Sequence, residues 1–261
     1  MRIALGIEYS GWNYFGFQRQ NTKVTIQGEL EKALSKVANA PVEIQCAGRT
    51  DAGVNATGQV VHFDVANERT DRGWVLGTNG NLPDDIAVTW ARHVDEGFHA
   101  RFSARARRYR YILQNTQNRP GLLKRGVSVY MGQYDVELMQ KAASMLIGEH
   151  DFSSFCGADE ESSSKSRCVH FIEVSRHGPY IIFDIAANAF LNHMVRNIVG
   201  SLLPVGSHEH DLKWFEDVFA ARKRSLAGPT ARPDGLYLVD VAYPSEFGLP
   251  KRDLLGPLWL P

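Results

Sequence analysis

A short loop with a glycine at its start and another near its end carries an acidic residue where it can do chemistry. In Gly48–Val54, hereafter the Asp51 loop, Arg49 precedes Asp51 by two residues. Glycines allow a tight turn and let a ligand approach the backbone closely. A nearby cation lowers a carboxyl pKa by roughly 1–3 units, so Asp51 is expected to be ionised and suited to be a nucleophile or charge stabiliser. The alternative is a structural turn in which Asp51 bonds its own backbone and Arg49 faces water.

A second candidate site is a basic segment. The stretch Phe98–Arg125 holds eight of the 29 basic residues and none of the 29 acidic ones, although the formal net charge of the chain is zero. This local excess predicts a confined site for a polyanion. Arginines there can bind phosphates, and the interleaved Tyr109 and Tyr111 can stack on a base, worth about 1–3 kcal/mol per base. The alternative is a solvated, charged strand edge. The arginines concerned are Arg101, Arg105, Arg107, Arg108 and Arg110.

A third candidate is a cation in an apolar helical stretch. Arg196 lies among Met194, Val195 and Ile198. An unpaired buried charge is very costly, so Arg196 needs a partner, and Asp51 is an attractive one. The alternative is an arginine whose aliphatic part covers the helix while its guanidinium reaches solvent.

Hydrophobic periodicity predicts the elements that position these residues. Thr25 can cap a helix, and alternating apolar residues indicate strands. The pattern favours an α+β fold with a mostly antiparallel sheet over a series of βαβ units. Residues 10–20, rich in glycine and aromatics, are expected to cover the core, with a ligand contact as the alternative. The expected helices are 26–38, 74–79, 136–147, 190–203 and 212–221; the expected strands are 2–9, 42–47, 59–65, 86–94, one from 107, 169–176, 180–186 and 236–242.

Composition limits the class of protein. The 261 residues are 44% hydrophobic and 22% charged, enough for one large domain or two ordinary ones. The three cysteines show no paired spacing, and the start of the chain turns polar too early for a signal peptide, so we expect a cytoplasmic protein. No run of about 18 apolar residues occurs, so we do not expect the chain to enter a membrane. The nine histidines are scattered, and no P-loop or Gly-x-Gly-x-x-Gly occurs, so neither a metal nor a nucleotide cofactor is predicted.

Several motifs together resemble the TruA family of tRNA pseudouridine synthases, which act in the anticodon stem-loop. They span nearly the whole chain in the family's order and spacing, and jointly they are specific. The motifs are the Asp51 loop, Phe98–Phe102, Arg108–Tyr111, Asn188–Leu191, His193–Asn197 and Gly235–Leu238.

The resemblance implies isomerisation of uridine to pseudouridine at about positions 38, 39 and 40 of tRNA. It implies two pseudo-symmetric ferredoxin-like α/β halves with a central cleft, which we place at residues 1–104 and 105–261, and a homodimer without a cofactor. Asp51 would be the catalytic carboxylate, Tyr109 would hold the flipped base, Arg196 would pair with Asp51, Leu236 would line the pocket and Arg49 would touch the tRNA. The residues expected to contact RNA are Arg49, Phe98, His99, Ala100, Arg101, Phe102, Arg105, Arg107, Arg108 and Arg110.

Two positions depart from the family pattern. Asn55 stands where many relatives have His, and the acidic run Asp159–Glu161 lies in a loop where the family tends to contact RNA. Acidic side chains repel phosphate, so we do not expect direct contact there. Two other functions compete with the isomerase: a non-catalytic RNA-binding protein, in which the Asp51 loop is structural, and a glycoside hydrolase, which usually needs a second carboxylate that no comparable loop supplies.

Overall fold

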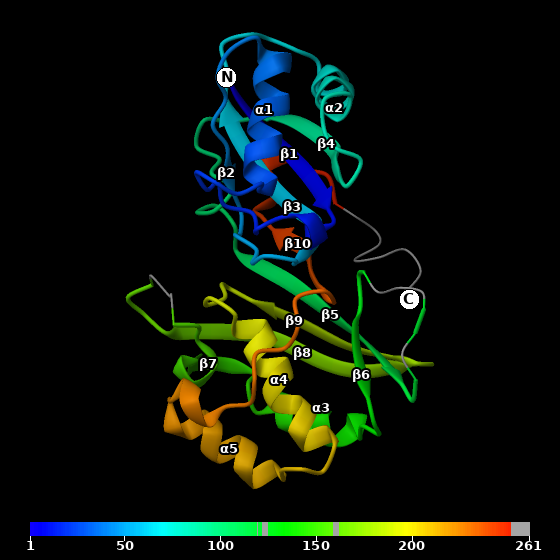
Figure 1. Ribbon diagram of the computed structural model, residues 1–261. Coiled ribbons are helices and arrows are strands. Elements are labelled where there is room, and N and C mark those ends of the chain that lie inside the picture. Colours follow the sequence, from blue (N-terminus) through cyan, green and yellow to red (C-terminus); the bar gives the residue numbers. More distant parts are fainter. Residues whose placement is uncertain (119, 122–124, 159–161, 252–261) are drawn as a thin grey trace. The chain divides into compact units, whose positions relative to one another are not determined.

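The chain forms two compact units. The structure, a computed structural model, describes residues 1–118, 120–121, 125–158 and 162–251 (Figure 1). The first unit comprises Met1–Arg107 together with the segment that begins at Tyr237, and the second comprises Arg108–Leu236. The first unit therefore takes in both the N-terminal part of the chain and the segment after Leu236, and the second begins at Arg108.

The first unit is built on a mostly antiparallel sheet. Its central strand β1 (Arg2–Tyr9) is antiparallel to both β3 (Asn55–Asp64) and β4 (Ile86–Val94). The other edge of β3 pairs with the short β2 (Gln45–Cys46), antiparallel, and with the start of β10 (Leu236–Ala242), parallel. β10 joins β3 at Asn55, directly after the Asp51 loop, so the sheet fixes the end of that loop.

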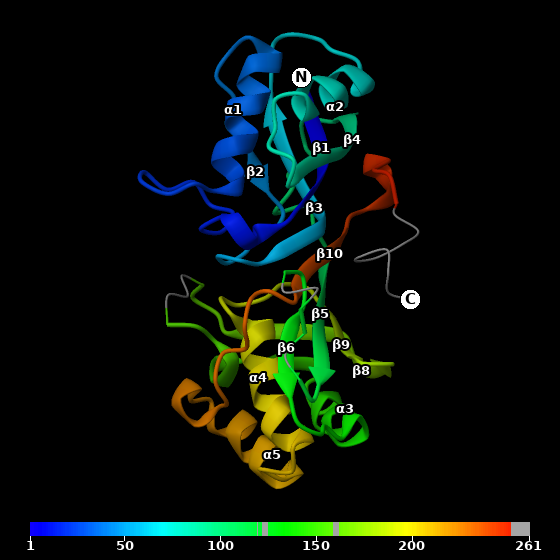
Figure 2. The ribbon, with the colours of Figure 1, turned by 45° about the vertical axis from the view of Figure 1, so that its right-hand side comes forward.

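Two helices complete the first unit. Helix α1 (Ile26–Ala38) begins at Thr25, whose hydroxyl accepts a hydrogen bond from the Gly28 N–H, and buries Ile26, Leu30 and Leu34. Helix α2 (Asp71–Asn79) contacts α1 and β4, as Figures 1 and 2 show. Burial of the apolar side of each helix stabilises the helix on the sheet more than its intrinsic propensity does.

The second unit repeats the combination of an antiparallel sheet with helices. Its strands follow the order β5-β9-β8-β7, and β6 pairs in parallel with β5. The helices α3, α4 and α5 gather on one side of this sheet (Figures 1 and 2). The elements are β5 (Ala106–Thr116), β6 (Ser128–Met131), α3 (Val136–Ser144), β7 (Gly148–Asp151), β8 (Ser166–His177), β9 (Tyr180–Ala187), α4 (Met194–Gly206) and α5 (Leu212–Ala221).

The α+β class with mostly antiparallel strands is confirmed, and α1, β4, α5 and β10 have the bounds we expected. Helix α4 differs: it begins at Met194 rather than at 190, because His193 takes a left-handed φ of 58°, and it continues past Pro204 to Gly206. Strands β6 and β7 were not expected. None of the helices in the described ranges combines the length and apolarity needed to cross a membrane.

Candidate active site

The Asp51 loop ends in a tight turn in the first unit. The Val54 N–H donates to the Asp51 carbonyl at 3.1 Å, and Gly53 has φ +79°, which favours glycine. Asp51 is half-buried, while Arg49 is exposed. The turn therefore presents a carboxylate at a fixed position with a cation close by in the sequence.

Side chains of the neighbouring strands hold the start of the loop. Gln59 of β3 donates from Nε2 to the Gly48 carbonyl at 2.6 Å. The hydroxyls of Tyr9, at the end of β1, and Thr50 are 2.8 Å apart and buried. Buried hydrogen bonds of this kind are costly to break, because each leaves an unsatisfied polar group. They fix the residue immediately before Asp51.

The segment that follows β1 holds the same loop from its other side. The Phe17 N–H donates to the Thr50 carbonyl at 3.0 Å, and the Gly11 N–H donates to Asn55 Oδ1 at 2.9 Å. Gly16 has φ +86°, and a Cβ there would lie 2.9 Å from the Thr50 carbonyl oxygen. The aromatic segment 10–20 thus supports the Asp51 loop directly. Asn55 has a structural role at this contact.

Two histidines shape the Phe98–Phe102 segment. His62 Nδ1 accepts from the Ala100 N–H at 3.1 Å, and His99 Nδ1 accepts from the Arg101 and Phe102 N–H groups at 3.1 and 3.3 Å. Both rings must be neutral at Nδ1 to accept these bonds. Burial lowers the pKa of His62 to about 4 and also lowers the pKa of His99. The segment is therefore held by imidazoles that stay uncharged at neutral pH.

Arg107 joins this basic segment to the Asp51 loop. Its guanidinium donates to the carbonyl of Ala47 at 2.9 Å, to that of Arg101 at 2.6 Å and to that of Ala104 at 3.2 Å. Ala47 immediately precedes the loop. Arg107, which we expected from the sequence to bind phosphate, thus donates hydrogen bonds to three backbone carbonyls. These bonds connect the residue before the Asp51 loop with the segment around Arg101.

The other members of the predicted RNA-contact set in this unit differ in exposure. Phe98 is 0% exposed, with Tyr243 and Phe247 around it, whereas Phe102 is 77% exposed. Arg101 and Arg105 are exposed. Direct contact with a partner is open to the exposed side chains, and Phe98 anchors their segment in the core.

Arg108 and Arg110 form an ion-pair cluster in the second unit. Arg108 Nε lies 2.7 Å from Asp184 Oδ1, and Arg110 Nη2 lies 2.9 Å from Asp184 Oδ2. The exposed fractions are 11% for the side chain of Arg110 and 8% for that of Asp184. The sequence showed the two arginines on one strand face but gave no sign of this acid on β9.

Tyr109 and Tyr111 occupy the opposite face of β5, as strand alternation requires. Tyr109 packs edge-on against Phe190, with ring centroids 4.9 Å apart at 84°, and Tyr111 meets Phe183 at 6.1 Å. Both tyrosines are buried. Phe190 belongs to the Asn188–Leu191 motif, so two of the sequence motifs meet within the second unit.

Arg196 stands in the first turn of α4. Its Nε donates to the Ala231 carbonyl at 2.8 Å, and the Ala231 N–H donates back to the Arg196 carbonyl at 3.1 Å. The segment around Ala231 thereby orients the guanidinium. Leu236, at the start of β10, is buried and immediately precedes Tyr237, which pairs with Asn55.

A buried polar network behind Arg196 was not found from the sequence. Thr230 donates from Oγ1 to Asn197 Oδ1 at 2.7 Å, and Arg224 donates to the same oxygen at 3.0 Å. The Asn197 amide donates to the Phe155 carbonyl at 2.8 Å. Asn197 and Thr230 are the chain neighbours of Arg196 and Ala231, so the network fixes the Arg196–Ala231 contact. The sequence signal for this network was the presence of Asn197 and Ser201 close to Arg196 in a mostly apolar helix.

Comparison with known proteins decides the family. A family model described as tRNA pseudouridine synthase matches residues 6–103 and 142–244. The chain belongs to the tRNA pseudouridine synthase family. Curated members named tRNA pseudouridine synthase A include proteins from Aeromonas hydrophila, 60% identical over all of this chain and 97% of the relative, and from Shewanella amazonensis, 59% identical over all of both. A Vibrio vulnificus relative is 58% identical over all of this chain and 98% of its own length.

A tRNA pseudouridine synthase is an isomerase that converts uridine in tRNA to pseudouridine. The reaction breaks the bond between uracil N1 and ribose C1′ and joins C5 to C1′, with no atom added and no redox change. Such a reaction calls for a carboxylate that can stabilise or attack an electron-poor centre. The Asp51 loop provides a carboxylate held in a defined backbone conformation.

In the part of the chain that the structure describes, no group of three His, Cys, Asp or Glu side chains is arranged to hold a metal ion. The acidic run Asp159–Glu161 lies outside the described residues, so our expectation that it avoids RNA stays a prediction. The roles assigned to Asp51, Tyr109, Arg196 and Leu236 stay predictions as well.

Proposed function

We propose that this tRNA pseudouridine synthase modifies uridines at about positions 38, 39 and 40 of the anticodon stem-loop, with Asp51 as its catalytic carboxylate. The observation that supports this most is the construction of the Asp51 loop: a half-buried carboxylate on a turn whose preceding residue, Thr50, is bonded by both Tyr9 and Phe17.

In this proposal the target base leaves its stack, at a cost of a few kcal/mol, and is held against Tyr109 with Leu236 beside it. Arg196 pairs with Asp51 and orients its carboxylate. Arg49, Arg101, Phe102 and Arg105 contact the RNA. His99 and Arg107, through hydrogen bonds to the backbone of Arg101 and Phe102, hold that segment in place.

Two chemical routes use the same carboxylate. Asp51 can add covalently to the sugar or the base, or it can remove the C2′ proton while the N1–C1′ bond breaks, as carboxylates stabilise cationic sugars in glycosidases. In both routes the C5 proton is released once C5 has joined C1′. A primary isotope effect from deuterium at C2′ would assign proton removal.

The position of the target uridine is tested with tRNA transcripts that carry C5-tritiated uridine at only one of positions 38, 39 and 40. Each should release tritium, and a transcript labelled only in another stem should release none. Release from the other stem alone would exclude the anticodon stem-loop as the substrate. We further propose that the enzyme is a cytoplasmic homodimer without a cofactor. Light scattering tests the dimer, and an activity assay of metal-free enzyme tests the lack of a cofactor.

A further inference from the structure

The segment next to the Asp51 loop carries an exposed aromatic–cation pair. Phe15 is 50% exposed, and the Lys23 ammonium lies 3.9 Å from the centroid of its ring. A phenyl ring with an ammonium over its face offers a ligand both an apolar surface and a positive charge.

This pair sits on a closed, well-supported loop. The Phe15 N–H donates to the Val24 carbonyl at 3.0 Å, and Gln20 Nε2 donates to the Phe15 carbonyl at 2.9 Å. The two ends of the loop are therefore joined, and the ring projects from a defined position.

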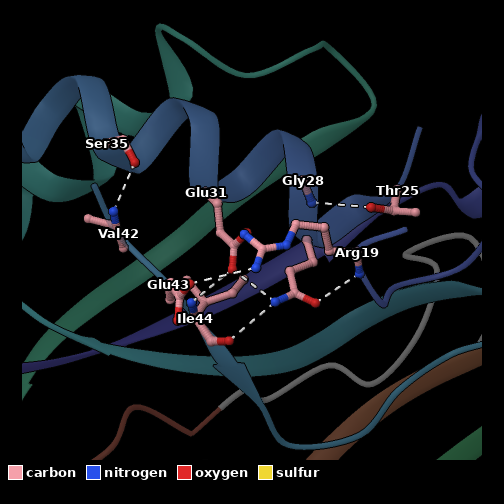
Figure 3. A network of polar contacts seen from close by, with 9 residues as sticks. Arg19, Thr25, Gly28, Glu31, Ser35, Val42, Glu43 and Ile44 are labelled. Atoms are coloured by element: carbon pink, nitrogen blue, oxygen red, sulfur yellow. Dashed lines mark hydrogen bonds and ion pairs between the residues drawn. The ribbon is translucent and has the colours of Figure 1, made fainter. Parts of the chain in front are cut away.

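Figure 3 shows what anchors the far side of this loop on α1. The Arg19 guanidinium donates to Glu31 at 2.9 Å, and the Arg19 N–H donates to Gln27 Oε1 at 2.9 Å. Glu31, 7% exposed at its side chain, also accepts from the Ile44 N–H at 3.1 Å. One buried carboxylate thus connects this loop to the strand that leads into the Asp51 loop.

The base of the loop is bonded to the Asp51 loop itself. The Gly53 N–H donates to the Tyr14 carbonyl at 3.4 Å, and Phe17, two residues after Phe15, donates to Thr50. Phe15 is therefore flanked on both sides in the chain by residues that contact the loop carrying Asp51.

A similar pair adjoins the start of the Asp51 loop. Phe102, 77% exposed, has the Arg101 guanidinium 5.7 Å from its ring centroid. Arg107 binds the carbonyls of both Arg101 and Ala47. The first unit therefore carries two exposed phenylalanine–cation pairs, each on a segment that is hydrogen-bonded to the Asp51 loop or, through Arg107, to the residue before it.

We propose that the Phe15–Lys23 pair binds an unpaired nucleotide of the substrate RNA next to the target uridine, with a base stacked on Phe15 and a phosphate on Lys23. The inference rests on the proposed function of Asp51. Proteins that bind single-stranded nucleic acid combine aromatic side chains with cations in this way. Protein–protein interfaces are depleted in lysine, so a lysine on the ring favours RNA over a second protein surface.

The test compares Phe15→Ala, Phe15→Trp and Lys23→Ala with the wild-type enzyme. Leu76→Ala is the matched control, because Leu76 is a 59% exposed apolar residue on α2. Affinity for unmodified tRNA is measured at three salt concentrations. Phe15→Ala should bind roughly 5- to 150-fold more weakly, as loss of one stacked base implies, while Phe15→Trp should bind nearly as the wild type does. Lys23→Ala should reduce the salt slope by roughly 0.7.

A second arm identifies the nucleotide. Abasic substitutions are scanned through the anticodon loop of the tRNA. At one position, the abasic substitution should weaken tRNA binding by the wild-type enzyme but not by Phe15→Ala. The variant has already lost the stacking contact that the missing base would make.

The inference is overturned if Phe15→Ala binds tRNA with the same affinity as Leu76→Ala. It is also overturned if the affinity losses from Phe15→Ala and from an abasic substitution simply add at every position of the anticodon loop. It is also overturned if Phe15→Ala changes the oligomeric state and leaves RNA affinity intact, which would make the pair a protein interface. Failure of the proposed function has a different result: Asp51→Asn would then release tritium, or only tRNA labelled outside the anticodon stem-loop would release it, whatever Phe15→Ala does.

Discussion

Gln59 binds Gly48 through both atoms of its side-chain amide. Nε2 donates to the Gly48 carbonyl at 2.6 Å, and Oε1 accepts from the Gly48 N–H at 3.4 Å. One fully buried side chain of β3 therefore sets the backbone at the start of the Asp51 loop. If Asp51 is catalytic, Gln59 acts on the reaction without touching the substrate.

The first prediction concerns Gln59→Leu. Loss of the buried hydrogen bonds should lower the free energy of unfolding by about 1–3 kcal/mol and should lower kcat by displacing Asp51, with little change in tRNA affinity. Asn79→Leu is the matched control. The side-chain amide of Asn79, on α2, likewise bonds both the carbonyl and the N–H of a single residue, Val88. Asn79→Leu should lose similar stability and keep kcat. Equal kcat in the two variants would argue against a positioning role for Gln59.

Thr230→Val tests the network behind Arg196. The substitution keeps the shape but removes the hydroxyl that bonds Asn197 and Arg224. We expect a loss of about 1 kcal/mol of stability and a reduced kcat, because the adjacent Ala231 orients Arg196. Urea unfolding and single-turnover kinetics measure the two effects. Thr70→Ala, which removes the N-cap of α2, should cost similar stability without changing kcat.

The Asp184 cluster separates structural arginines from RNA-binding ones. Arg110→Ala leaves Asp184 without one of its two cations and should destabilise the enzyme by about 3 kcal/mol, with a small effect on the salt slope of tRNA binding. Arg105→Ala, at an exposed position, should leave the melting temperature unchanged and reduce that slope by nearly 1. If Arg110→Ala instead kept its stability and reduced the salt slope by nearly 1, Arg110 would be a residue that contacts RNA.

Stability should depend on pH through His62. Burial depresses its pKa to about 4 in the folded protein, with His99 and Arg2 acting in the same direction. Between about pH 6.5 and pH 4 the unfolded chain binds the additional proton, so stability rises with pH across this window and is lost as pH falls. The contribution is on the order of 3 kcal/mol. His62→Asn, which keeps an acceptor for the Ala100 N–H, should flatten the dependence in urea unfolding at pH 4.5 to 7.5. An unchanged dependence would assign it to other groups.

Local signals explain which elements the sequence predicted well. Helix α1 has the expected bounds because Thr25 caps it and apolar residues recur along one side. Helix α4 starts later than expected because a left-handed backbone at His193, unlike one at glycine, leaves no mark in the sequence. Strands β6 and β7 are short, and their existence depends on pairing with distant strands.

The same distinction applies to the site. The Asp51 loop was identified from its own residues, since its glycines and charges are adjacent in sequence. The partners of Arg107, Arg108 and Arg110 lie on other strands and loops, so their charge pattern alone suggested phosphate contacts. Hydrogen bonds to carbonyls and a distant Asp184 became apparent only in the folded chain.

The most direct test of the account is tritium release from C5-labelled uridine in unmodified tRNA, with wild-type enzyme and Asp51→Asn side by side. Asparagine keeps the size of the side chain and removes its charge. The account predicts release by the wild type, no release above background by Asp51→Asn, and tRNA affinities that agree within about threefold. Turnover by Asp51→Asn at about a tenth of the wild-type rate or more would contradict the assignment of Asp51 as the catalytic carboxylate.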